Sequence, residues 1–197
     1  MLLHDKLSPY RLILASASPR RRQLLAECDL RFEVAEPFEC EECYPSELPS
    51  REVAQYLSQL KSKAYPHALA ENDILLTADT VVIVDDAILG KPADRDDAAA
   101  MLRSLSGRDH LVVTGVTIRS AEKQCSFSVE SRVRFRALSD DEIGYYIERY
   151  RPFDKAGSYG IQEWIGYVAI ESIEGSFFNV MGLPVQRLYV ELATFVE

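Results

Sequence analysis

The sequence lacks any apolar run that approaches the length of a membrane-spanning helix. Its first residues, MLLHDKLSPYRLILAS, also lack the charged segment followed by an apolar stretch that marks a secretion signal. Hydrophobic residues make up 47% of the chain and charged residues 27%, which is an ordinary balance for a globular protein. We therefore expect a soluble, cytoplasmic protein with no membrane partner.

Cysteine and histidine are both scarce. The four cysteines form no recognisable disulfide framework, so reduced thiols are the simplest interpretation. Cys40 and Cys43 have the spacing of half a zinc site, but no second half follows and the three histidines are scattered. The sequence context does not pair any serine or cysteine with a histidine, so it does not indicate a nucleophilic catalytic pair.

Positive charge is also in short supply. The chain has 22 lysine and arginine residues against 31 aspartate and glutamate residues, a formal net charge of −9. A field of this sign repels polyanions, so we expect no nucleic acid polymer as a partner. The basic residues are concentrated at Arg20–Arg22 and at Lys61 and Lys63, which suits a small phosphorylated ligand.

Strand and helix patterns alternate along the chain, which predicts an α/β fold in a single domain over residues 1–197. Apolar or alternating runs predict strands over 11–15, 74–84, 111–118, 127–136 and 167–173. Helical spacing predicts helices over 20–27, 50–64, 94–104, 139–149 and from 184 onward, with Ser50 capping the second and a capping box at Ser139 opening the fourth. Residues 36–49 and 151–162 are predicted as loops and Asp85–Asp86 as a turn.

Asp79 lies inside the apolar strand predicted over 74–84. Burying an aspartate there is costly unless the carboxyl is paired, protonated or bound to a metal. Strand ends in α/β sheets are also where ligands gather. The structural alternative is an edge-strand aspartate that faces water, but the functional interpretation is favoured.

The segment Ser16–Arg21 combines hydroxyls, free backbone N–H groups at a helix start and a guanidinium, which together can bind an anion. A solvated helix start with Ser18 as its cap explains the same segment, and from this segment alone it is slightly favoured. Lys91 follows a glycine as in a phosphate-binding loop, but the rest of the Walker pattern is absent and a simple turn residue is the alternative.

The glycines of 154–162 let the backbone approach a ligand, and Tyr159 and Gln162 could meet a base or sugar. An ordinary ordered loop would look similar. Glu41 and Glu42 add carboxylates for a hard cation such as Mg²⁺, which commonly bridges carboxylates and substrate phosphates. The whole inventory fits phosphoanhydride hydrolysis. A haloacid-dehalogenase type phosphatase would need a second aspartate at position 81, which is valine.

Four segments occur in a particular order: Ser-Ala-Ser-Pro-Arg-Arg at 16–21, Ala-Asp-Thr-Val-Val at 78–82, Gly-Lys-Pro at 90–92 and Asp-Lys-Ala-Gly-Ser-Tyr-Gly-Ile-Gln at 154–162. This ordered set resembles the Maf family of nucleotide pyrophosphatases, and the resemblance covers about residues 12–192. It implies an elongated, two-lobed α/β fold around a mixed β-sheet, like that of inosine triphosphate pyrophosphatases, with a central cleft. It also implies cleavage of a nucleoside triphosphate to the monophosphate and pyrophosphate with Mg²⁺ or Mn²⁺, and it suggests a homodimer.

The resemblance further implies roles for individual residues. Asp79 matches the catalytic aspartate of the family and, together with Glu41 near the loop carboxylate, is a candidate metal ligand. Phosphate binding is implied for four residues: Ser16, Arg20, Lys63 and Lys91. Arg21 is a further phosphate-binding candidate as part of the Ser16–Arg21 segment.

The last motif resembles the family branch that acts on dTTP and UTP. The branch that acts on 7-methyl-GTP typically carries cysteine where this chain has Lys155, and it lacks Tyr-Gly-Ile-Gln. Arg20, Thr80 and Gln162 match positions associated with substrate choice. A glutamine amide can pair with both the acceptor and the donor of a uracil-type base, which makes a pyrimidine preference chemically reasonable.

We expect Asp79 to act as the general base that prepares water for attack on the α-phosphate, or else chiefly as a metal ligand. The physiological substrate could be a modified nucleotide. The rival class is a non-catalytic nucleotide-binding regulator of cell division, because Maf proteins have been linked to septum formation. Such a role needs a partner surface, and the sequence shows no exposed apolar stripe.

Overall fold

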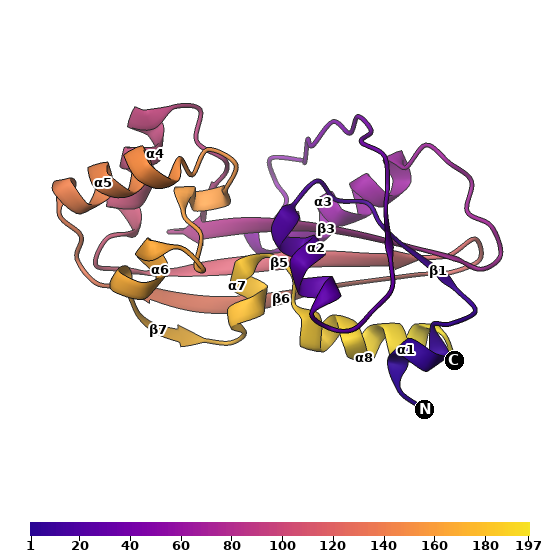
Figure 1. Ribbon diagram of the computed structural model, residues 1–197. Helices are drawn as coiled ribbons and strands as arrows, with labels where there is room; N and C mark the ends of the chain where they lie inside the picture. The colour runs from indigo at the N-terminus through magenta and orange to yellow at the C-terminus, as the bar shows by residue number, and fades with distance from the viewer. The chain divides into compact units, whose positions relative to one another are not determined.

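The computed structural model describes all 197 residues as a mixed α/β protein (Figure 1). One seven-stranded sheet has the order β2-β1-β3-β5-β6-β7, and β4 pairs with β3. The sheet contains both parallel pairs (β1 with β2 and β3) and antiparallel pairs (β3 with β4, β6 with β7), so the predicted mixed sheet is confirmed. The strands are β1 (Arg11–Leu14), β2 (Glu33–Val34), β3 (Asp73–Val84), β4 (Ala87–Leu89), β5 (Asp109–Arg119), β6 (Gln124–Phe135) and β7 (Ile170–Glu174).

Eight α-helices and one short 3₁₀ turn connect the strands. They are α1 (Leu3–Lys6), α2 (Pro19–Ala26), α3 (Ser50–Ala64), α4 (Arg95–Leu105), α5 (Asp140–Tyr150), η1 (Ala156–Ser158), α6 (Trp164–Ala169), α7 (Phe177–Met181) and α8 (Val185–Phe195). The order of the long elements matches the predicted alternation, and β3 is flanked on both sides by β1 and β5. The alternative that placed Asp79 on an edge strand is therefore wrong. No helix reaches the length and apolarity needed to span a membrane.

Two local predictions were wrong. Ser50 does not cap α3, because the N-cap position is Pro49 and no side chain caps that end. Residues 167–169 are helical rather than strand-like, and only Ile170–Glu174 pair with β6. The apolar run 167–170 does not alternate, and Ile165 and Ala169, four residues apart, bury one face of α6.

The chain divides into two compact units. Unit 1 comprises Met1–Asp79, Thr114–Val129 and Gly182–Glu197, and unit 2 comprises Thr80–Val113 and Glu130–Met181. Asp79 is thus the last residue of the first stretch of unit 1. The single domain with a central cleft stays a prediction.

In unit 1, helices α3 and α8 cover opposite faces of the strands (Figure 1). Two successive residues of β6 show that the helices lie on opposite faces, because successive side chains of a strand point to opposite faces of the sheet. Ser126 hydrogen-bonds Thr117, which in turn contacts Ser58 of α3, whereas the next residue on, Phe127, lies against Arg187 of α8. The two termini meet on the α8 side, where the Lys6 Nζ lies 2.6 Å from a carboxylate oxygen of Glu197.

Gly115 of β5 allows α3 to approach the sheet closely. A β-carbon at this position would lie 2.3 Å from backbone atoms of Ala54 and Gln55, closer than any real contact. Because the opposing atoms are backbone, the helix itself would have to move. Gly115 therefore sets the distance between β5 and the helix that carries Lys61.

We expect Gly115→Ala to destabilise the fold by about 1–3 kcal/mol or more, the usual range for overpacking a rigid interior. The matched control is Gly144→Ala on α5, where a β-carbon would meet nothing within 4 Å. That control should be neutral or stabilising by up to about 1 kcal/mol, because alanine is the better helix former. Urea denaturation of both variants measures the difference, and equal stabilities would contradict the close approach.

His110 lies in the core of unit 2 between Phe135 and Tyr159, with ring centroids 5.0 and 5.4 Å away. Its Nε2 is 2.8 Å from the Tyr159 hydroxyl. Burial, against a small opposing effect of Asp109, lowers the pKa of His110 from 6.5 to about 4. Burial likewise raises the pKa of Tyr159, so both groups are neutral at pH 7.

This depressed pKa predicts that the protein loses stability as the pH falls from about 6.5 towards 4. In that window the unfolded chain binds a proton at His110 that the folded protein excludes. The full loss corresponds to roughly 3 kcal/mol. The difference in unfolding free energy between wild type and His110→Gln should therefore change with pH in this window and level off above it. A constant difference from pH 7.5 to 4 would contradict the assignment.

Candidate active site

Asp79 lies on β3 beside the C-terminal half of α3. Thr77, two residues earlier on the same face of the strand, donates its hydroxyl to the Ser58 carbonyl oxygen at 2.7 Å. The same alternation turns the Asp79 side chain towards α3, where Lys61 Nζ lies 2.5 Å from Asp79 Oδ1. Both side chains are largely buried, with exposed fractions of 12% for Asp79 and 17% for Lys61. The buried carboxylate is therefore paired, one of the conditions inferred from the sequence.

The ammonium group of Lys61 also contacts a second carboxylate, because Glu42 Oε1 lies 3.1 Å from Nζ. Glu42 comes from the loop before α3 and is exposed. One cation thus lies between the carboxylate of a rigid strand and that of a loop.

The helical spacing of α3 explains why Lys61 reaches the strand and Lys63 does not. Ala54 and Ser58 lie on the face of α3 that packs on the sheet. Lys61 comes three residues after Ser58 and seven after Ala54, so it lies on the same face. Lys63 lies on the exposed face of the helix and makes no ion pair.

Arg21 links the Ser16–Arg21 segment to the strand that carries Asp79. Its Nη1 donates to the Ala78 carbonyl oxygen at 2.9 Å and to Ser16 Oγ at 3.3 Å, and its Nε donates to the Gly182 carbonyl oxygen at 2.8 Å. Burial lowers the pKa of Arg21, while the charge of Asp79 raises it. A cation is thus fixed beside the catalytic candidate, so the purely solvated interpretation of this segment does not hold for Arg21.

The start of α2 agrees with the sequence prediction. Ser18 occupies the N-cap position and Pro19 begins the helix, where its missing N–H costs nothing. The Ser18 side chain makes no capping hydrogen bond, while its backbone N–H donates to Ser16 Oγ at 3.3 Å. Arg20, on the first turn of α2, is half-buried.

The remaining predicted residues are distributed differently. Glu41 is exposed, and its carboxylate accepts from Cys43 Sγ at 3.6 Å rather than meeting Lys61. Thr80 directly follows Asp79 on β3 and is half-buried. Lys91 and Gln162 belong to unit 2, where the Gly157 N–H donates to the Gly90 carbonyl oxygen at 3.0 Å and joins the 154–162 loop to the Lys91 turn.

The Gln162 side chain carries an acceptor that nothing in the protein satisfies. Its Oε1 is buried without a hydrogen-bond partner. Buried acceptors of this kind are usually satisfied by ordered water or by a ligand.

The donor set fits a divalent metal held partly by substrate. No group of three or more histidine, cysteine, aspartate or glutamate side chains could form an all-protein cage. Asp79 and Glu42 nevertheless converge on one cation, the ammonium of Lys61. Mg²⁺ is commonly bound through one or two carboxylates plus substrate phosphates, which is the arrangement these residues allow. All four cysteines are free thiols, as predicted.

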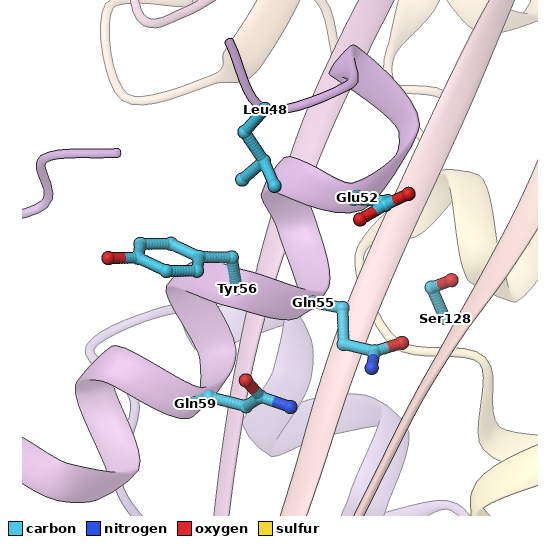
Figure 2. A pocket seen from close by; sticks show the side chains of 6 residues that line it. All are labelled: Leu48, Glu52, Gln55, Tyr56, Gln59 and Ser128. Carbon is cyan, nitrogen blue, oxygen red and sulfur yellow. The ribbon is translucent and has the colours of Figure 1, made fainter. Parts of the chain in front are cut away.

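A separate pocket of about 320 Å³ lies on the other side of α3 (Figure 2). One face of α3 lines the pocket with four side chains, those of Glu52, Gln55, Tyr56 and Gln59. Leu48 and Ser128 complete the lining. This face points away from the stripe that carries Lys61, so the pocket is distinct from the Asp79 cluster.

The sequence grouped Lys61 with Lys63 and Glu42 with Glu41, but it did not predict that Lys61 would contact Asp79 and Glu42. The buried stripe of α3 was a signal for Lys61, because Ala54 and Ser58 share its helical phase. No pattern in the loop distinguished Glu42 from Glu41, since neither lies in a regular element.

The chain is a mixed α/β protein in which a buried carboxylate, paired with a lysine, lies next to a strand carbonyl bound by a guanidinium. The chain belongs to the Maf-like protein family, whose model matches residues 11–195.

Similar curated proteins cover nearly the whole chain. A dTTP/UTP pyrophosphatase of Porphyromonas gingivalis strain ATCC 33277 is 56% identical over 195 residues, covering 98% of both chains. One of Parabacteroides distasonis is 51% identical over 191 residues, covering 97% of this chain and 99% of that one. Among solved structures, a HAM1 protein of Coxiella burnetii is 13% identical, covers 94% of this chain and 99% of its own, and has a TM-score of 0.47.

Proposed function

We propose that this protein is a nucleoside triphosphate pyrophosphatase that hydrolyses dTTP and UTP to the monophosphate and pyrophosphate. Membership of the Maf-like family and the names of relatives 45–56% identical over nearly the whole chain support this reaction. The single structural observation that carries it is the buried Asp79 paired with Lys61 beside the guanidinium of Arg21.

In this proposal Asp79 accepts a proton from a water molecule while the water oxygen attacks the α-phosphorus. The bond between the α-phosphorus and the oxygen that bridges to the β-phosphorus breaks, and pyrophosphate leaves. Lys61 holds Asp79 in place through its contact with Oδ1. A general base positioned in this way typically contributes ~10²–10⁴ in rate.

Charge on the phosphates is stabilised by the basic residues and by Ser16. Two backbone carbonyl oxygens hold the guanidinium of Arg21 in place. Little free energy is therefore needed to orient it when substrate binds. The other proposed phosphate-binding residues are Arg20, Lys63 and Lys91. Lys63 is exposed without an ion pair, so it can turn to a phosphate without losing a contact.

A divalent metal, Mg²⁺ or Mn²⁺, would be held by Asp79 and Glu42 together with substrate phosphates. The sequence pointed to Glu41 as the loop ligand, and the contact of Glu42 with Lys61 makes Glu42 the better-placed candidate. When bound, such an ion neutralises phosphate charge and favours departure of pyrophosphate. Asp79 could then be chiefly its ligand rather than the base.

Gln162 is proposed to recognise the base. Its unpartnered Oε1 can accept from the N3–H of uracil or thymine, while its amide N–H groups donate to a ring carbonyl. Arg20 and Thr80 are the other residues proposed to influence substrate choice.

A nucleotide panel tests this proposal. With Mg²⁺, release of pyrophosphate from dTTP and UTP should greatly exceed release from 7-methyl-GTP. No turnover of any nucleotide, canonical or modified, would instead support a non-catalytic regulator of cell division. Faster turnover of a modified pyrimidine nucleotide would make dTTP a secondary substrate.

The proposed homodimer is tested by light scattering, and the proposed cytoplasmic location by fractionation of cells.

A further inference from the structure

A buried polar network holds the loop of unit 2 that carries Gln162. The Tyr146 hydroxyl donates to Glu163 Oε2 and accepts from the Gly160 N–H at 3.0 Å. Glu163 Oε1 lies 3.1 Å from Lys155 Nζ, which also pairs with Asp154 at 2.8 Å. Lys155 and Tyr146 are buried, and only 18% of the Glu163 side chain is exposed. One carboxylate thus joins both ends of the loop to α5.

Glu163 and Gln162 both lie against the backbone of Gly160. A β-carbon at Gly160 would be 3.1 Å from Gln162 Nε2 and 3.1 Å from Glu163 Oε2. The negative carboxylate is therefore on the same side as the amide nitrogen. Its charge favours the –NH₂ end of the amide on that side and leaves Oε1, which is buried without a partner, as the free acceptor.

The backbone of the same loop is fixed on its other side by α6. A β-carbon at Gly166 would lie 1.8 Å from the Ile161 carbonyl oxygen, so the helix is in direct contact with the residue before Gln162. Gly157, with φ +66°, packs on Val82 of β3. The backbone around Gln162 is thus rigid, and the remaining freedom is the orientation of the side-chain amide.

Orientation of that amide decides which pyrimidine it can pair with. Uracil and thymine present an N3–H donor beside the O4 acceptor, whereas cytosine presents an N3 acceptor beside an amino donor. A glutamine amide that rotates by 180° exchanges its acceptor and its donors and pairs equally well with cytosine. Discrimination against cytosine therefore requires something that prevents this rotation.

We propose that Glu163, held by Tyr146 and Lys155, is a positioning residue that fixes the Gln162 amide for uracil and thymine and against cytosine. The proposal rests on the function proposed above, because it assumes that Gln162 meets the base. Glu163 itself touches no reacting atom. Its role is to set the selectivity of the site rather than its rate.

The test compares kcat/KM for UTP and CTP in wild type and in Glu163→Gln. This variant retains the shape of the side chain, and Lys155 retains its ion pair with Asp154, so the fold should survive. We expect the UTP/CTP ratio to fall about tenfold, equivalent to about 1.4 kcal/mol. The change should come from a higher KM for UTP and a lower KM for CTP, with kcat for UTP within about twofold of wild type.

Tyr146→Phe gives a second variant, since it keeps the ring contacts and removes only the hydroxyl that binds Glu163 and Gly160. It should lower the same ratio and speed hydrogen exchange of the Gly160 amide. The matched control is Glu148→Gln, an exposed glutamate on the same helix as Tyr146, which should change neither. Equal losses for UTP and CTP, or an unchanged ratio in a folded Glu163→Gln protein, would overturn the proposal.

Failure of the proposed function gives a different result. If wild type hydrolysed neither nucleotide, that function would be wrong, and the relative affinities of UMP and CMP by calorimetry would test the positioning role by themselves. Tighter binding of UMP that is lost in Glu163→Gln would support it. Equal affinities in wild type would overturn it.

Discussion

Replacing Asp79 by asparagine is expected to lower kcat for pyrophosphate release from dTTP and UTP by ~10²–10⁴, the usual contribution of a positioned general base. The amide keeps the size of the side chain but accepts a proton far less readily. Asp79 lies in a central strand and is almost fully buried, and the only other carboxylate that contacts Lys61 is that of the loop residue Glu42. Steady-state assays of pyrophosphate release, with circular dichroism to confirm folding, measure the effect.

The control for this experiment is Asp86→Asn, in the exposed turn after β3. Asparagine tolerates the left-handed φ of 62° found there, so activity and stability should be unchanged. Near-normal turnover of a folded Asp79→Asn protein would show that Asp79 is not the base. Calorimetric titration with Mn²⁺ separates the two roles, because a residue that is chiefly a metal ligand loses metal affinity along with activity.

Lys61→Met is expected to lower kcat by ~10²–10³, the usual cost of removing one preorganised cationic or hydrogen-bonding group from a site of this kind. The change removes the ammonium from between Asp79 and Glu42, so two carboxylates lose their partner and Asp79 loses its orientation. Steady-state kinetics on UTP should show the loss mainly in kcat.

Lys63→Met is the matched comparison, two residues away on the exposed face of α3. If Lys63 binds a substrate phosphate, its loss should raise KM and leave kcat within a few-fold of wild type, because it makes no contact with Asp79. A larger kcat loss in Lys63→Met than in Lys61→Met would mean that the Lys61–Asp79 pair is not part of the catalytic arrangement.

Much of the fold follows from local signals. The capping box at Ser139 and Glu142 opens α5 as predicted, because both hydrogen bonds it requires are local. The β-branched run of β3 gives a central strand, as its apolar character on both faces indicates. The region 164–174 could not be assigned this way. Its helix is short, and its strand exists only because it finds β6 as a partner.

The site was predictable where a residue violated its local environment. Asp79 stood out because a carboxylate within an apolar strand needs a partner, and the structure supplies Lys61. The choice between Glu41 and Glu42 depends on how the loop lies against α3, which no sequence spacing encodes. The network around Glu163 was equally invisible, because Tyr146 and Lys155 meet it only through tertiary packing.

The central claim is that water attacks the α-phosphorus of dTTP or UTP and that pyrophosphate leaves. Hydrolysis in ¹⁸O-labelled water, followed by mass spectrometry of the products, tests it most directly. We predict one ¹⁸O atom in each dTMP or UMP formed and none in pyrophosphate, because the water oxygen bonds to the α-phosphorus. Label in pyrophosphate, or release of orthophosphate with a nucleoside diphosphate, would contradict the account.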